Sequence, residues 1–198
     1  MSLLFRRIAK ESFGALAEQH GLTLVYQSEV RLEYKSKRVR MLVNFDNGRS
    51  YELAVAFNLV GSEAEQQPYS LAEVLRLKKH AAATSIEGQQ MDTQSSLDAA
   101  LKKAARLASE YASEQLSGSA EAFKQLAKQR SAEAIEYGLA RDLRAARFQA
   151  DRAWQEKDFA TVVRLYRPML NHLSPSEVKR FEFASARTDE NLEDCGRD

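Results

Sequence analysis

The chain has 198 residues, of which 29% are charged, and its net charge at pH 7 is +1. This length suits one domain, or one domain with a helical extension, and the composition excludes an intrinsically disordered chain. The nearly balanced charge excludes binding to nucleic acid or anionic membranes through overall charge alone. Every apolar run is shorter than the roughly 18 residues of a membrane-spanning helix, so we expect no membrane contact.

A single cysteine, Cys195, allows no intramolecular disulfide and no cysteine-based zinc site. The first residues, MSLLFRRIAKESF, lack the long apolar core and the small-residue cleavage site of a secretion signal. Together these features predict a reducing, cytoplasmic location. Cys195 lies in an acidic segment that disfavours its thiolate, so we do not expect it to be a nucleophile.

Residues 2–20 predict a helix, because apolar residues recur at helical spacing before Gly21, and residues 22–27 predict a short strand. From residue 29 to residue 59 apolar and polar residues alternate in three runs, which predicts half-buried strands. Asn47-Gly48 favours a hairpin before the last run. The fold class is therefore predicted to be α+β, with a four-stranded antiparallel meander covered by helices. Its apolar face is expected to contain Val30, Leu32, Tyr34, Val39, Met41, Val43, Phe45, Tyr51, Leu53, Val55, Phe57 and Leu59.

Residues 60–68 predict an exposed loop, and a Ser70–Glu73 capping box opens a helix that, with the first helix, should cover the sheet. Residues 81–93 predict a second loop. An Ala-rich helix follows from residue 95 to residue 116, with a narrow apolar seam suited to packing on another helix. Homo-oligomerisation through this seam is one possibility.

Ser117-Gly118-Ser119 predicts the boundary between an α+β domain (1–117) and a helical region (119–188). Residues 120–156 could form one helix or two. Ser174, Pro175 and Glu177 predict the start of a last helix. Residues 189–198 predict an acidic, flexible tail.

Residues 150–175 resemble a tetratricopeptide helical hairpin, with Ala150 and Ala153 at small-residue positions and Lys157-Asp158-Phe159 in place of the Gly-Asp-Tyr turn. An array needs about three repeats, so this resemblance implies the helix-turn-helix shape and no peptide groove. The whole chain resembles a group of uncharacterised bacterial proteins, some of which look like immunity proteins that neutralise a toxin. This second resemblance rests on residues 38–55, 69–77 and 154–184, and it implies a protein partner.

No catalytic constellation, cofactor motif or metal-ligand spacing is recognisable in the sequence. His20, His80 and His172 each fall at the end of a predicted helix, where the helix dipole favours a cation, so a structural role is expected. We therefore predict a non-catalytic protein that needs no cofactor.

The charge cluster of greatest interest is predicted on the polar face of the meander, in two neighbouring strands. It could bind an acidic protein or phosphates, or it could serve to keep an edge hairpin soluble. No aromatic residue is expected on that face to stack on a base. The candidate partner-binding residues are Arg31, Glu33, Lys35, Arg38 and Arg40, together with the loop of residues 62–68.

The leading hypothesis is a cytoplasmic protein–protein interaction module, of the immunity type, that occludes a partner's surface. Nucleic-acid binding through the basic hairpin of residues 31–40 is the first alternative. An enzyme whose catalytic groups are scattered over loops is the second.

Overall fold

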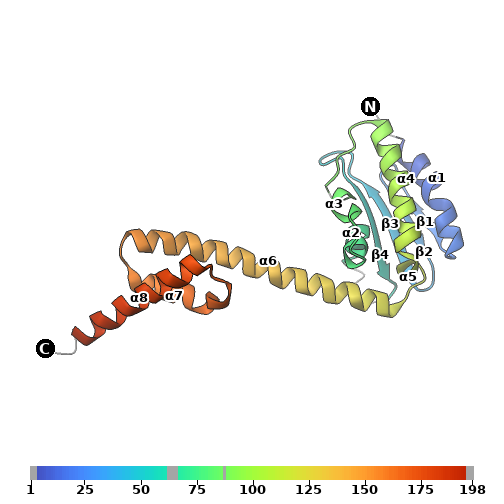
Figure 1. Ribbon diagram of the computed structural model, residues 1–198. Helices are drawn as coiled ribbons and strands as arrows, with labels where there is room; N and C mark the ends of the chain where they lie inside the picture. The colour runs from blue at the N-terminus through green and yellow to red at the C-terminus, as the bar shows by residue number, and fades with distance from the viewer. Residues whose placement is uncertain (1–3, 62–66, 87, 195–198) are drawn as a thin grey trace. The chain divides into compact units, whose positions relative to one another are not determined.

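The computed structural model describes residues 4–61, 67–86 and 88–194 (Figure 1). It divides into two compact units, Met1–Ser131 and Ala132–Asp198, which we call the N-terminal unit and the C-terminal unit. The division falls inside helix α6 (Ala120–Gln155), which is one continuous helix of 36 residues.

The described residues of the N-terminal unit form a five-stranded antiparallel sheet in the order β1-β2-β3-β4-β5. The α+β prediction is therefore confirmed, and the sheet has one strand more than predicted. The additional strand, β5, has only two residues, which is too short to show a period of two. The strands are β1 (Thr23–Gln27), β2 (Arg31–Lys35), β3 (Val39–Phe45), β4 (Leu53–Leu59) and β5 (Tyr69–Ser70).

The inner face of the sheet carries the alternating apolar side chains of β2, β3 and β4. Tyr51 was predicted to lie on this face, but it precedes β4, has a φ of 56° and is 43% exposed. A left-handed backbone cannot continue a strand, so β4 begins two residues later than Tyr51. The buried residues of the inner face are Leu32, Tyr34, Val39, Met41, Val43, Phe45, Val55 and Phe57.

Helices cover the inner face, as the sequence predicted. Helix α1 packs on helix α4 and on β2, while α2 and α4 pack on β4 (Figure 1). The capping box of α2 is present: Glu73 N–H donates to Ser70 Oγ (3.1 Å), and Ser70 N–H donates to the Glu73 carboxylate (2.7 Å). The helices are α1 (Phe5–Gln19), α2 (Leu71–Leu77), α3 (Ala82–Ile86), α4 (Gln94–Tyr111) and α5 (Ser113–Leu116).

Two predictions for residues 81–116 need correction. Helix α3 occupies part of the stretch expected to be a loop, and the expected single helix is interrupted at Ala112, between α4 and α5. The apolar seam of α4 is buried in the core of its own unit, so it is not available to a second copy of the chain. The seam residues are Leu97, Ala100, Ala104 and Leu107.

The N-terminal unit extends beyond the boundary predicted at residues 117–119. Those residues form the turn between α5 and α6, and the first turns of α6 still belong to the first core through Phe123 and Leu126, which are buried. Arg130 of α6 is bound to Glu73 of α2. These long-range contacts agree with a division after Ser131.

The C-terminal unit has its own small core between the end of α6, helix α7 (Phe159–Tyr166) and helix α8 (Pro175–Asp194). The helix–turn–helix shape expected around residue 157 is present, and α8 completes it. The 3-10 helix η2 (Arg167–His172) follows α7 and includes Pro168, which lacks a backbone N–H group. Helix α8 continues to Asp194, past the predicted start of the tail, and residues 195–198 lie outside the described part. The buried core residues are Ala150, Ala153, Val162, Val163, Tyr166 and Ala184.

Candidate functional site: the outer sheet face

The outer sheet face carries the side chains that alternate along β2 and β3 with those of the inner face. The antiparallel register sets Lys35 directly opposite Arg40, and Arg31 and Glu33 follow at two-residue spacing along β2. Because residues at this spacing share one face of a strand, four of the five predicted side chains lie together. We use the name outer sheet face for Tyr26, Arg31, Glu33, Lys35 and Arg40.

Glu33 is the centre of the outer sheet face. Its carboxylate lies 2.9 Å from Arg31 Nη2 and 2.9 Å from Arg40 Nε, and its side chain is only 13% exposed. One carboxylate thus accepts a hydrogen bond from Arg31 and forms an ion pair with Arg40. Because three cationic side chains surround this single anion, the face remains cationic.

Tyr26 also belongs to the outer sheet face, although the alternation in the sequence does not reveal it. Strict alternation from Leu24, on the inner face, would turn Tyr26 inwards. The register shifts between Leu24 and Tyr26, however, so that Tyr26 lies opposite Glu33. This β-bulge adds Val25 as an extra residue and turns Tyr26 outwards. The tyrosine is 52% exposed, and Arg31 Cζ lies 5.7 Å from its ring centroid.

Arg38 occupies a different position from the one predicted. It lies in the turn between β2 and β3, one residue before Val39, and not on a strand. Its side-chain stem packs against Gly118, where an added Cβ would approach Arg38 Cβ to 2.6 Å. Arg38 therefore borders the outer sheet face without lying in its centre.

The other predicted contact, the loop of residues 62–68, lies largely outside the described residues. Of its described part, the carbonyl oxygens of Gln67 and Pro68 accept hydrogen bonds from the Arg130 guanidinium, each at 3.0 Å. These two carbonyl groups are therefore engaged within the N-terminal unit.

His20 and His172 lie at helix ends, as predicted, whereas His80 lies between α2 and α3 and its ring accepts from an N–H group at the start of α3. His20 caps the C-terminus of α1, and His172 is the last residue of η2. His80 Nδ1 accepts a hydrogen bond from Ala82 N–H (3.1 Å), and its ring lies 4.5 Å from that of Tyr111. Within residues 4–61, 67–86 and 88–194, no cluster of three or more His, Cys, Asp or Glu side chains is arranged to hold a metal ion.

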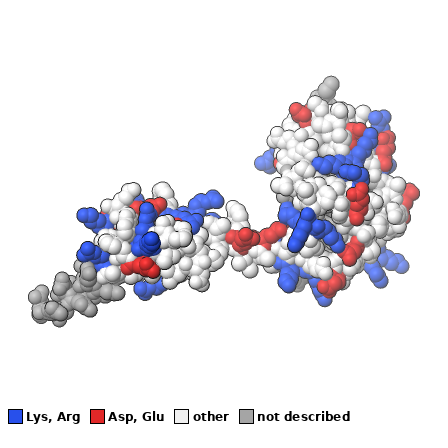
Figure 2. All heavy atoms as spheres, viewed as in Figure 1, with Lys and Arg blue, Asp and Glu red and all other residues white. Residues whose placement is uncertain are grey.

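The opposite side of the N-terminal unit has a different charge pattern. Figure 2 shows Lys and Arg side chains interspersed with Asp and Glu over the side that α4 occupies in Figure 1. On α4 itself, Lys102 is paired with Asp98 at 2.8 Å and is 68% exposed. Mixed charges of this kind are typical of a solvated helix face.

Comparisons with family models, with curated proteins and with solved structures found no match to this chain. None of the described helices is both long enough and apolar enough to cross a membrane.

Proposed function

We propose that this chain is a non-catalytic protein-binding module of the immunity type, which covers an acidic surface of a partner protein with its outer sheet face. The observation that carries the proposal is the arrangement around Glu33, whose carboxylate is paired with both Arg31 and Arg40, with Arg31 beside the exposed Tyr26. Arginine and tyrosine are enriched among the residues that dominate binding energy in protein interfaces.

Pre-organisation is what makes these arginines suitable anchors. A free arginine loses rotamer entropy when it binds, whereas Arg31 and Arg40 are already held by Glu33. Their guanidinium groups can form paired hydrogen bonds with carboxylates of a partner. The partner surface that fits this face therefore carries Asp or Glu side chains.

The test is an affinity pull-down of the full-length tagged protein from its native cells, followed by mass spectrometry and calorimetry on the recovered partner. We expect one stoichiometric protein partner. Replacing both Arg31 and Arg40 by Ala should weaken its binding by about 2 kcal/mol or more.

The matched control removes two cations from α4, Lys102→Ala with Arg106→Ala, and should leave the affinity unchanged. Recovery of no partner, or equal losses in the two double variants, would contradict the proposal.

Nucleic-acid binding is the second candidate, favoured by Tyr26, which brings an exposed aromatic ring to the same face as Arg31. It predicts an affinity that falls steeply with salt and that is lost when Arg38 and Arg40 are both replaced by Glu. A protein partner whose binding depends only weakly on salt would exclude this candidate.

A further inference from the structure

A cavity of about 180 Å³ lies in the N-terminal unit beside the edge of the sheet. Strand β5 pairs with β4 only at Ala56 and Phe57, and the next pairing along this edge is the bridge between Glu52 and Gln90. Residues 53–55 of β4 therefore have no strand partner on this side within the described residues. The cavity lies next to this interrupted edge.

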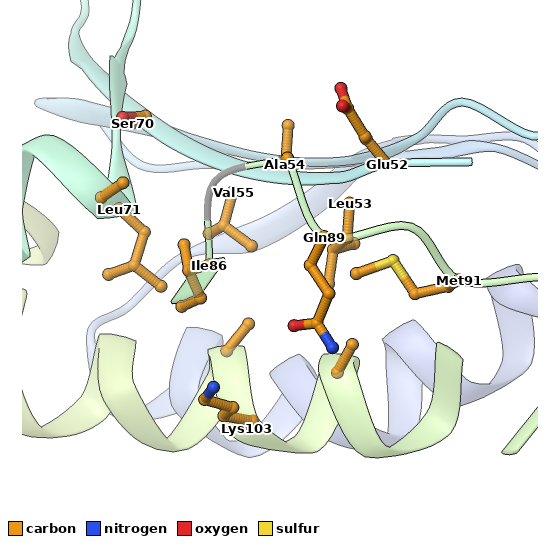
Figure 3. Close-up of a pocket in the computed structure, with 14 residues that line it drawn as sticks. Glu52, Leu53, Ala54, Val55, Ser70, Leu71, Ile86, Gln89, Met91 and Lys103 are labelled. Atoms are coloured by element: carbon orange, nitrogen blue, oxygen red, sulfur yellow. The ribbon is translucent and has the colours of Figure 1, made fainter. Parts of the chain in front are cut away.

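The wall of the cavity is mainly apolar. Figure 3 shows Leu53, Val55, Ile86 and Gln89 directed into the space between the sheet and α4. The side chains deepest in the wall are buried, whereas Glu52, Gly88 and Gln89 are exposed and mark the opening. The principal apolar wall residues are Leu53, Val55, Leu71, Ile86, Met91 and Ala104.

Four polar residues line the cavity, namely Glu52, Ser70, Gln89 and Lys103, and Ser70 Oγ already accepts a hydrogen bond from Glu73 N–H. Lys103 of α4 is half-buried, and its Nζ donates a hydrogen bond to Ser85 Oγ at 3.0 Å. Among the described residues, no carboxylate forms an ion pair with Lys103. The amide of Gln89 points toward α4, while the carboxylate of Glu52 points away from the cavity (Figure 3). The wall thus offers one cation and one amide to a ligand.

We infer that this cavity binds a small monocarboxylate with an aliphatic chain of about six to eight carbons. A cavity of about 150 Å³ holds benzene, so the space suits an apolar group of this size. The chain gains from leaving water for the wall around Met91, and the carboxylate binds the Lys103 ammonium group. An apolar pocket with a few convergent polar groups is the usual form of a small-molecule site. This inference does not depend on the proposed function.

The test uses octanoate as the probe and the full-length protein labelled with ¹³C at its methionine methyl groups. We expect octanoate to shift the Met91 methyl signal saturably and to leave that of Met169, in the C-terminal unit, unmoved. 1-Octanol, which lacks the charge, should bind at least about tenfold more weakly.

Two lysine-to-glutamine variants test where the carboxylate of octanoate binds. Lys103→Gln should lower octanoate affinity about tenfold, because the charge-assisted hydrogen bond is lost. Lys102→Gln removes the same charge from the neighbouring residue, which does not line the cavity, and should change nothing. A further variant, Ala100→Leu, fills the space and should abolish the shift.

Three results would each overturn the inference: a Met91 signal that does not respond, equal affinities for octanoate and octanol, or unchanged octanoate binding by the Lys103→Gln protein. The Arg31→Ala and Arg40→Ala double variant should bind octanoate normally, which separates this test from that of the protein partner.

Discussion

Glu177 is held by three hydrogen bonds at the start of α8. It accepts from Arg147 Nε (2.6 Å), from Arg147 Nη2 (3.1 Å) and from Ser174 N–H (2.7 Å). The Arg147 hydrogen bonds, with those from Ser174, lower the pKa of the Glu177 carboxyl from 4.5 to about 2. The charged form is therefore favoured in the folded state.

This pKa predicts an acid-dependent stability of the C-terminal unit. A lowered folded-state pKa stabilises the fold at pH values above 4.5, and the stabilisation is lost as the pH falls toward about 2. Glu177→Gln should lower the free energy of unfolding by about 1 kcal/mol at neutral pH. The effect is no larger because Arg147 is exposed enough for water to screen the pair. Urea unfolding followed by Trp154 fluorescence would measure this difference in unfolding free energy. The difference should vanish as the pH approaches about 2, where the Glu177 carboxyl is protonated. Glu156→Gln, in an exposed pair with Arg152, is the control, and an equal effect there would contradict the prediction.

Asn58 raises a different question, because it is fully buried and neither Oδ1 nor Nδ2 has a hydrogen-bond partner. A buried unpaired amide is costly, so an apolar side chain of similar shape should be tolerated or favoured. We expect Asn58→Leu to raise the free energy of unfolding by about 1 kcal/mol. Asn171→Leu, at an exposed site in η2, should have almost no effect. A destabilised Asn58→Leu protein would show that the amide finds a partner in solution.

At the level of elements, Arg130 attaches the beginning of α6 to α2. Its guanidinium forms paired hydrogen bonds with the Glu73 carboxylate (2.6 and 2.8 Å), and its Cζ lies 4.0 Å from the ring centroid of Tyr69. Burial raises the pKa of the Glu73 carboxyl, but the hydrogen bonds from Arg130 and Ser70 outweigh it, and the pKa lies below its ordinary value. The pair is therefore charged at neutral pH.

Arg130→Ala should destabilise the N-terminal unit by about 2 kcal/mol, because it leaves a largely buried carboxylate without its partner. Arg130→Lys should lose part of this energy, since lysine cannot form the paired hydrogen bonds. Hydrogen exchange of the α6 amide groups before residue 131 would measure the loosening. Lys128→Ala, at an exposed site on the same helix, is the control. If Arg130→Lys behaved like the native protein, the charge alone would account for the attachment.

For the whole molecule, the main feature is that each unit has its own core. Trp154 is the chain's single tryptophan and packs against the C-terminal core, with its ring 5.6 Å from Phe159. Its fluorescence therefore reports on the C-terminal unit. Phe57, in contrast, is fully buried in the N-terminal core.

We predict that Phe57→Ala lowers the stability of the N-terminal unit by about 3 kcal/mol, owing to the cavity it leaves. Circular dichroism, which reports on both units, should show that part of the protein unfolds at a lower denaturant concentration. The midpoint of the Trp154 fluorescence transition should stay unchanged. Phe159→Ala, in the C-terminal core, should move the Trp154 fluorescence transition to lower denaturant concentration and leave the N-terminal part of the dichroism transition in place. If the Trp154 fluorescence transition moved to lower denaturant concentration in the Phe57→Ala protein, the units would unfold as one.

Periodicity predicted the parts of this fold that local sequence determines. The alternation of residues 30–45 requires one buried face, and it gave the strands β2 and β3 correctly. Ser70 and Ser174 each precede a Glu by three residues, and both capping boxes are present. In these cases the residues that decide the structure are neighbours in the chain.

The remaining features depend on residues that are distant in sequence. The contact of Arg130 with Glu73, 57 residues away, joins α6 to α2, and no periodic pattern reveals it. The cavity beside β4 is lined by four segments that are distant in sequence, so no local pattern predicts it. The four strand residues of the outer sheet face were found from the alternation, whereas Tyr26 was missed because a bulge interrupts it.

The bulge in β1 has an evolutionary consequence. If Val25 were deleted, Leu24 would still lie opposite Tyr34 and Tyr26 opposite Glu33, since Val25 is the extra residue. Residue 25 is thus a position where a related chain could be one residue shorter and keep the same two faces. A deletion at Tyr34 or Met41, within regular strands, would instead exchange the faces of the residues that follow in the same strand. An alignment of relatives should therefore place its single-residue gaps in this sheet at position 25.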